Sequence, residues 1–104
     1  MATDMKPGVY VRGKVLTCTG TLYNRKDGSG QFVRVRHEIS TRPGIIEYEQ
    51  VLDPARDTGV KVENGQLIAY PSIPEDTLVT LKVVPEAIVE YKGKVRIMKA
   101  ERVA

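Results

Sequence analysis

The sequence predicts an all-β protein, built as a small barrel or sandwich of five to seven short strands. Three observations predict it: β-branched residues dominate the apolar set, no segment has the periodicity of a long helix, and glycine, proline and asparagine interrupt the chain at short intervals. The chain has 104 residues, the length of one typical domain, so we expect residues 1–104 to fold as a single unit.

The first strand-like run, residues 9–23, changes the face on which its apolar side chains lie. These side chains occupy odd positions at first (Val9, Val11, Val15) and even positions later (Leu16, Cys18, Leu22). The change predicts a bulge or a glycine-assisted bend at Gly13 or Gly20, which a strand needs when it curves around a small barrel. Cys18 is the only cysteine and so has no disulfide partner in the chain, and we expect it to be a small buried hydrophobic residue.

Residues 24–30 form a predicted turn rich in flexible residues, and the clearest alternation in the chain follows it. One face of this second strand carries Val33, Val35, His37 and Ile39, and the other carries Phe32, Arg34, Arg36 and Glu38. Alternation with a period of two is typical of a strand that has one buried and one solvent-facing side. We therefore expect Phe32 in solvent beside the arginines, whereas a register slip of one residue would place it in the core.

The remaining strands are separated by recognisable turns. Pro43-Gly44 is a predicted turn before a strand at 45–51, and residues 52–59 form a loop with room for one helical turn. Asn64-Gly65 gives the strongest hairpin signal, because this pair suits the type I′ turn that matches the twist of its strands. A proline-rich connection at 71–77 leads to the last elements, which are strands at 78–84 and 87–91, a tight turn at Lys92-Gly93 and a final strand at 94–103.

The charges are segregated along the chain although the net charge is only +3. Residues 1–42 carry a net charge of +5, residues 43–90 carry −6, and residues 91–104 carry +4. If the two basic ends lie side by side, the domain has one basic face and one acidic side, which favours a polyanionic partner. The alternative is that these charges only cover solvated strand faces.

The sequence offers no catalytic, metal or cofactor site, and we expect a protein that is not an enzyme. One histidine and one cysteine exclude a zinc cluster, no glycine-rich phosphate loop is present, and the acids of the middle segment are scattered. His37 shares the apolar face of its strand, so we expect a hydrogen-bonded histidine in the core or at its edge and not a general base.

The sequence also predicts a cytoplasmic protein without a membrane partner. No apolar run approaches the ~20 residues that a membrane span requires, and residues 1–8 lack the apolar stretch of a secretory signal. A lone cysteine fits a reducing compartment.

Basic residues interleaved with aromatic ones are the most informative pattern. One hairpin carries Tyr23, Arg25, Lys26, Phe32, Arg34 and Arg36, a second turn repeats the pattern as Tyr91-Lys92-Gly93-Lys94, and the polar face of the first strand adds Arg12 and Lys14. Exposed aromatic rings stack with unpaired bases while neighbouring cations neutralise phosphates. Because no segment could serve as a recognition helix in a duplex groove, the pattern predicts a single-stranded nucleic-acid interface.

Three stretches share features with a known family. A basic hairpin at 23–36 follows a long first strand, Val60-Lys61-Val62 precedes Gly65-Gln66 and Ala69-Tyr70-Pro71, and residues 78–103 combine an aromatic-Lys-Gly tip with a basic last strand. In these stretches, about two thirds of the chain, the sequence resembles the filamentous-phage helix-destabilising proteins, the gene V type of single-stranded-DNA-binding protein.

The resemblance implies a five-stranded OB-like barrel with protruding hairpins, a two-fold dimer and cooperative coating of single strands during phage replication in the host cytoplasm. It also implies DNA contacts from Tyr23, Arg25, Lys26, Phe32, Lys61, Tyr91 and Arg102.

Other readings stay open at this stage. The chain could be a structural or protein–protein interaction β-domain of a phage or other assembly, with its segregated charges acting as complementary patches on neighbouring subunits. RNA is also a possible partner, because nothing in the sequence reports on a 2′-hydroxyl. Open edge strands on a small barrel favour a homodimer.

Overall fold

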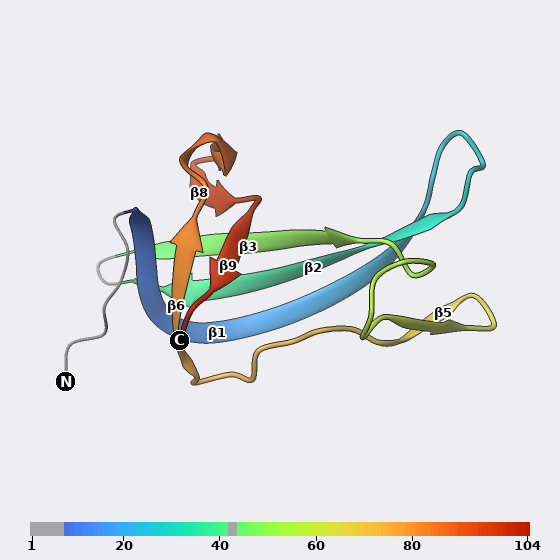
Figure 1. Cartoon of the computed structure of the whole chain (residues 1–104), viewed down its shortest axis with the longest axis horizontal. Coiled ribbons are helices and arrows are strands. Elements are labelled where there is room, and N and C mark those ends of the chain that lie inside the picture. Colours follow the sequence, from blue (N-terminus) through green and yellow to red (C-terminus); the bar gives the residue numbers. More distant parts are fainter. Residues whose placement is uncertain (1–7, 42–43) are drawn as a thin grey trace.

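The computed structural model describes residues 8–41 and 44–104, apart from the side chain of Tyr91, and within them the protein is mostly β. A seven-stranded sheet has the order β7-β8-β3-β2-β1-β6-β9, and β4 and β5 form a separate two-stranded sheet. Figure 1 shows the large sheet curled into a half-barrel. The all-β prediction is confirmed, but nine strands are described where the sequence predicted five to seven and the resemblance implied five.

The long first strand is shared between two neighbours around a bend. The second half of β1 (Val9–Asn24) pairs with β2 (Gln31–Ser40), and its first half pairs with β6 (Leu78–Val83), both antiparallel. The register shifts between Val15 and Thr17, so the predicted bulge exists but lies at neither glycine. Gly13 instead allows close approach at the bend, since a Cβ there would clash with the carbonyl oxygen of Ser40.

The C-terminal elements lie at the two edges of the curled sheet. The strand β3 (Ile45–Leu52) pairs with β2 and, in parallel, with β8 (Lys94–Ile97), which also pairs with β7 (Ile88–Tyr91). The next strand, β9 (Ala100–Arg102), pairs with β6 at the other edge. The predicted single strand at 94–103 is therefore wrong, because the chain must leave one edge at residues 98–99 to reach the other.

Both ends of this crossing are held by backbone hydrogen bonds. Met98 N–H donates to the carbonyl of Ala87, which ends the short 3₁₀ turn η1 (Pro85–Ala87), over 2.8 Å. Val84 N–H donates to the carbonyl of Lys99 over 3.2 Å.

The core fills the inside of the curl. Its buried side chains come from five strands and the 71–77 connection: Val15, Ile39, Tyr48, Ile73, Val79, Leu81, Val83 and Ile97. On β2 the residues Val33, Val35, His37 and Ile39 are all buried, as the alternation predicted. Arg34 is exposed, and Phe32, Arg36 and Glu38 are partly exposed on the opposite, outer face.

The Asn64-Gly65 hairpin forms as predicted. It joins β4 (Lys61–Glu63) to β5 (Gln66–Ala69), with φ of 52° at Asn64 and 74° at Gly65, values that suit a type I′ turn. Lys92 and Gly93 have φ of 50° and 79°, so the second tight turn is of the same kind. The predicted Pro43-Gly44 turn falls partly outside the described residues. The loop at 52–59 contains a single turn of helical type, in which the carbonyl of Asp53 accepts from Arg56 N–H over 3.0 Å and from Asp57 N–H over 2.8 Å.

The β1–β2 hairpin and the β4–β5 hairpin project toward the same end of the molecule. Figure 1 shows the β1–β2 turn in cyan and the β4–β5 turn in yellow. The molecule measures 46 × 30 × 24 Å along its principal axes. No helix in residues 8–41 and 44–104 is long and apolar enough to cross a membrane.

Candidate nucleic-acid interface

The β1–β2 turn is ordered by its own hydrogen bonds. Arg25 N–H donates to the carbonyl of Gly30 over 2.8 Å, and Asp27 accepts from both the backbone and the hydroxyl of Ser29. These bonds from Ser29 hold the pKa of the Asp27 carboxyl below its ordinary value. A turn with φ of 76° at Gly28 and 140° at Gly30 therefore has a defined shape despite its glycines.

Two aromatic rings stack at the base of this turn. Tyr23 and Phe32 are directly opposite each other on β1 and β2, and their ring centroids lie 5.2 Å apart with planes inclined by 15°. The Arg25 guanidinium carbon lies 5.3 Å from the Phe32 centroid, and that of Arg34 lies 5.6 Å from Tyr23. Aromatic and cationic side chains that the sequence placed in one hairpin thus form one contiguous surface.

The strand register extends this surface along the outer face of the sheet. Arg36 lies opposite Thr19, Arg34 opposite Thr21, and Tyr23 opposite Phe32. Before the bulge, the even-numbered residues of β1 face outward, so Arg12 and Lys14 are exposed beyond the bend. The predicted site residues that share this face are Arg12, Lys14, Tyr23, Phe32, Arg34 and Arg36.

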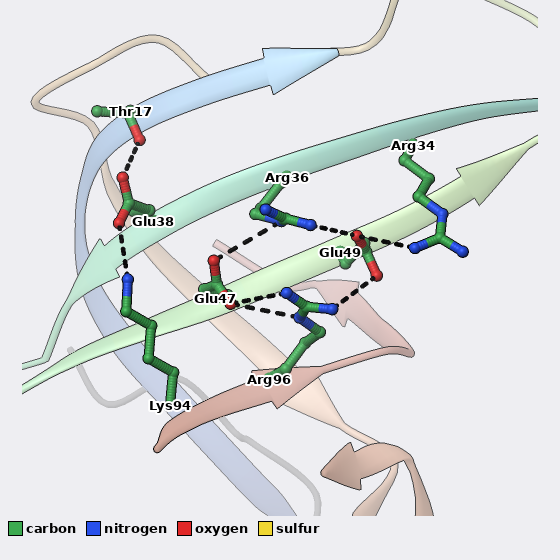
Figure 2. Close-up of polar contacts among 8 residues, drawn as sticks. All are labelled: Thr17, Arg34, Arg36, Glu38, Glu47, Glu49, Lys94 and Arg96. Carbon is green, nitrogen blue, oxygen red and sulfur yellow. Dashed lines mark hydrogen bonds and ion pairs between the residues drawn. The ribbon is translucent and has the colours of Figure 1, made fainter. Parts of the chain in front are cut away.

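Ion pairs gather three arginines and two glutamates on this face, and we call these residues the Arg–Glu cluster: Arg34, Arg36, Glu47, Glu49 and Arg96 (Figure 2). Arg96 donates from Nη2 to Glu47 Oε1 over 3.1 Å and from Nε to the same oxygen over 3.3 Å. Arg36 donates from Nη2 to Glu49 Oε1 over 3.1 Å, and this hydrogen bond raises the pKa of Arg36. Arg34 and Arg36 lie two residues apart on β2, and they thus form ion pairs with Glu47 and Glu49, which lie two residues apart on β3.

Lys94 adds a further cation beside one end of the Arg–Glu cluster. Its ammonium group lies 3.9 Å from Glu38 Oε2, and Thr17 donates to Glu38 Oε1 over 2.7 Å. Figure 2 shows these three residues as a row beside the Arg–Glu cluster, running from β1 across β2 to β8. The structure therefore brings Lys94, from the second basic region, to the face that carries Arg34 and Arg36.

Other predicted contacts lie elsewhere. Lys61 is on the separate β4–β5 hairpin, 3.1 Å from Glu63. Arg102 borders a pocket with His37 and Tyr48, which point to the inner side of the sheet, so it is not on the outer face. Lys26 and Lys92 are exposed in the two turns, and the side chain of Tyr91 lies outside the described part of the structure.

Sequence reasoning missed Glu47, Glu49 and Arg96. The acids of the middle segment are scattered along the sequence, yet in the fold two of them are buried against arginines. A signal was available, because Arg34-Val35-Arg36 and Glu47-Tyr48-Glu49 have the same alternation and could pair as neighbouring antiparallel strands.

His37 is the hydrogen-bonded core histidine that the sequence predicted. Its side chain accepts from Ile73 N–H at Nε2 over 3.0 Å, and burial lowers its pKa. Cys18 is a free, half-buried thiol whose pKa is raised by burial. In the described ranges, no group of three or more histidine, cysteine, aspartate or glutamate side chains could hold a metal ion.

Comparisons with known proteins return no relatives. No family model, no curated protein and no solved structure matches this chain.

Proposed function

We propose that this protein binds single-stranded DNA without sequence specificity, through the outer face that runs from the β1–β2 turn to Lys94. The observation that carries the proposal is the stacked Tyr23–Phe32 pair with guanidinium groups beside it. Tyr23 is 42% exposed, so an unpaired base can reach the aromatic pair. Stacking on aromatic rings tolerates every base, which accounts for binding without sequence preference.

The cations along the same face supply the affinity for the phosphate backbone. Arg34, Arg36 and Lys94 follow the aromatic pair on one side of the sheet, and Arg12 and Lys14 continue around its bend. Each phosphate that such a residue neutralises releases counterions and strengthens binding at low salt. RNA remains a candidate ligand for the same chemistry, and the tests below include it.

The proposal includes an OB-like barrel, and one feature of the fold is in its favour. A long first strand that pairs with β2 through one half and with β6 through the other lets a small sheet curl around one core. We include in the proposal the role that the resemblance to the phage proteins implies, the coating of single strands during replication in the host cytoplasm.

We further propose that the protein is a homodimer. Apolar side chains are exposed on the C-terminal elements, among them Val84, Ile88, Val89, Val95, Met98 and Val103. Pairing of copies would cover such side chains together with the open edges β7 and β9.

The same exposed side chains favour the second candidate function, a protein–protein interaction module in a phage or other assembly. Size-exclusion chromatography at low and high salt, with and without an oligonucleotide, separates the two functions. A dimer that takes up the oligonucleotide is expected, whereas large salt-sensitive oligomers that form without it indicate the assembly module.

Replacing Phe32 by alanine tests the site. We expect Phe32→Ala to weaken binding to a dT oligomer by about 1–3 kcal/mol, because one of the two rings on which a base could stack is removed. The fold should be retained. Fluorescence anisotropy gives the affinity and circular dichroism checks the fold. Ile68→Ala is the matched control, since Ile68 is 52% exposed on the separate β4–β5 hairpin, and its affinity should be unchanged. Equal affinities for Phe32→Ala and wild type would exclude the aromatic pair from the interface.

A further inference from the structure

The Arg–Glu cluster carries an inference about how the outer face recognises phosphate. We propose that Glu49 is a positioning residue that holds Arg34 and Arg36 as a phosphate-binding pair. An acidic side chain then strengthens the binding of a polyanion. The inference rests on the proposed single-strand binding and adds a residue that does not itself touch the nucleic acid.

Glu49 lies beneath the arginines. Its side chain is 0% exposed, whereas those of Arg34 and Arg36 are 43% and 38% exposed. A single-stranded nucleic acid that passes over the outer face therefore meets the guanidinium groups of Arg34 and Arg36 and cannot reach the Glu49 carboxylate. The repulsion between Glu49 and a phosphate is limited by the three cations around it.

One carboxylate joins guanidinium groups from two strands. Glu49 Oε1 accepts a hydrogen bond from Arg36 over 3.1 Å and lies 4.0 Å from Arg34 Nη1, and its Oε2 lies 3.7 Å from Arg96 Nη1. A guanidinium group with its Nε has five N–H donors, so the bond to Glu49 leaves the 38% exposed Arg36 side chain with further donors for a phosphate, although its Nε is buried 3.7 Å from Glu47. Fixing the side chains in advance lowers the entropy that is lost when they bind phosphate.

The cluster is not neutral. Three arginines face two glutamates, so one positive charge remains on the five residues. The outermost of them, Arg34, also lies within 5.7 Å of the Phe32 centroid, which joins the phosphate-binding pair to the aromatic pair. Thr19 and Thr21, opposite Arg36 and Arg34, add exposed hydroxyl donors to the same face.

The sign of a charge-removing substitution separates positioning from simple electrostatics. Removing an acid from a DNA-binding face raises affinity if only net charge matters, by about twofold for a charge ~10 Å from a phosphate in water. If Glu49 positions the arginines, Glu49→Gln lowers affinity instead, by about tenfold. The slope of log affinity against log salt also becomes shallower, because fewer ordered phosphate contacts form.

The experiment measures the affinity of a fluorescent dT oligomer of about 15 nucleotides at several salt concentrations. Glu49→Gln is compared with Glu101→Gln, which removes an exposed acid that lies opposite Lys82, outside the Arg–Glu cluster and the Lys94–Glu38 pair, and which should leave affinity unchanged or raise it by up to about twofold. Arg36→Lys keeps the charge but removes the guanidinium, and it should weaken binding severalfold, while Arg56→Lys, in the loop after β3 and outside the proposed interface, should not. Thermal melting by circular dichroism checks that each variant is folded at the assay temperature.

The outcomes separate this inference from the function on which it rests. Weaker, less salt-sensitive binding by Glu49→Gln, with no weakening by Glu101→Gln, supports the positioning role. Unchanged or tighter binding by Glu49→Gln overturns it while the single-strand function stands. If Glu49→Gln does not fold, Arg36→Lys decides, and wild-type affinity in that variant overturns the inference. If the wild type does not bind the oligomer at low salt, both the function and the inference fail.

Discussion

At the scale of single residues, His37 connects three parts of the chain. It lies on β2, and its ring stacks with that of Tyr48 on β3, with 6.1 Å between the ring centroids. Its Nε2 accepts a hydrogen bond from the backbone N–H of Ile73, in the connection between β5 and β6. The side chain is 1% exposed. An acceptor at Nε2 requires the proton of the neutral ring to be on Nδ1, so the fold depends on the neutral form.

This dependence predicts a loss of stability in mild acid. Burial lowers the pKa of folded His37 below the ordinary 6.5, so the unfolded chain takes up a proton first. The free energy of unfolding should be constant above about pH 6.5 and should fall as the pH drops from there to the folded pKa, by at most about 1.4 kcal/mol per pH unit.

Urea unfolding measured between pH 8 and pH 5 checks this. His37 is the only histidine, so a folded His37→Asn variant should lose the dependence in that window. A wild-type profile that stays flat from pH 7 to pH 5 would contradict the role given to the neutral imidazole.

At the scale of elements, Gly20 lets the 61–70 hairpin dock on β1. A Cβ at Gly20 would lie 2.7 Å from the ring of Tyr70, which directly follows β5, so the ring covers the bare backbone of the glycine. This contact packs the end of the hairpin against β1.

We predict that Gly20→Ala destabilises the fold by about 1–3 kcal/mol, because the Tyr70 ring must move away. Gly44→Ala is the matched control, since no atom lies within 4 Å of its added Cβ and its φ is not in the left-handed region, and it should change stability by less than about 0.5 kcal/mol. Thermal or urea unfolding gives both values. The steric cause also requires that Gly20→Ala cost less in a Tyr70→Ala background, and an equal cost there would refute it.

Sequence periodicity predicted most of the elements and missed the places where chain segments meet. The alternation at 32–39 and the Asn64-Gly65 turn are local signals, and both are confirmed. The position of the bulge and the break at residues 98–99 depend on which strands become neighbours, and local sequence does not encode this. The local sequence predicts a bulge or bend at Gly13 or Gly20, but the role of Gly20 depends on the ring of Tyr70, 50 positions away.

At the scale of the molecule, folding changes the meaning of the charge pattern. Along the sequence a basic start and a basic end flank an acidic middle, but in the fold Glu47 and Glu49 of the middle bind Arg36 and Arg96 from the two basic segments. The basic face therefore contains buried acids. Tyr23, Phe32 and Arg34 could be placed together from the sequence because they belong to one hairpin, whereas Arg96 joined them only through the pairing of β3 with β8.

The central claim is that this outer face binds single strands, and a salt titration of wild-type protein with a dT oligomer, a DNA duplex and a single-stranded RNA tests it most directly. We predict that the dT oligomer binds more tightly than the duplex, with affinity falling by about 0.7 log units per log unit of salt for each phosphate contact. RNA affinity equal to that of DNA would widen the ligand class without changing the face. Equal or tighter binding to the duplex, or no salt-sensitive binding to any single strand, would contradict the account.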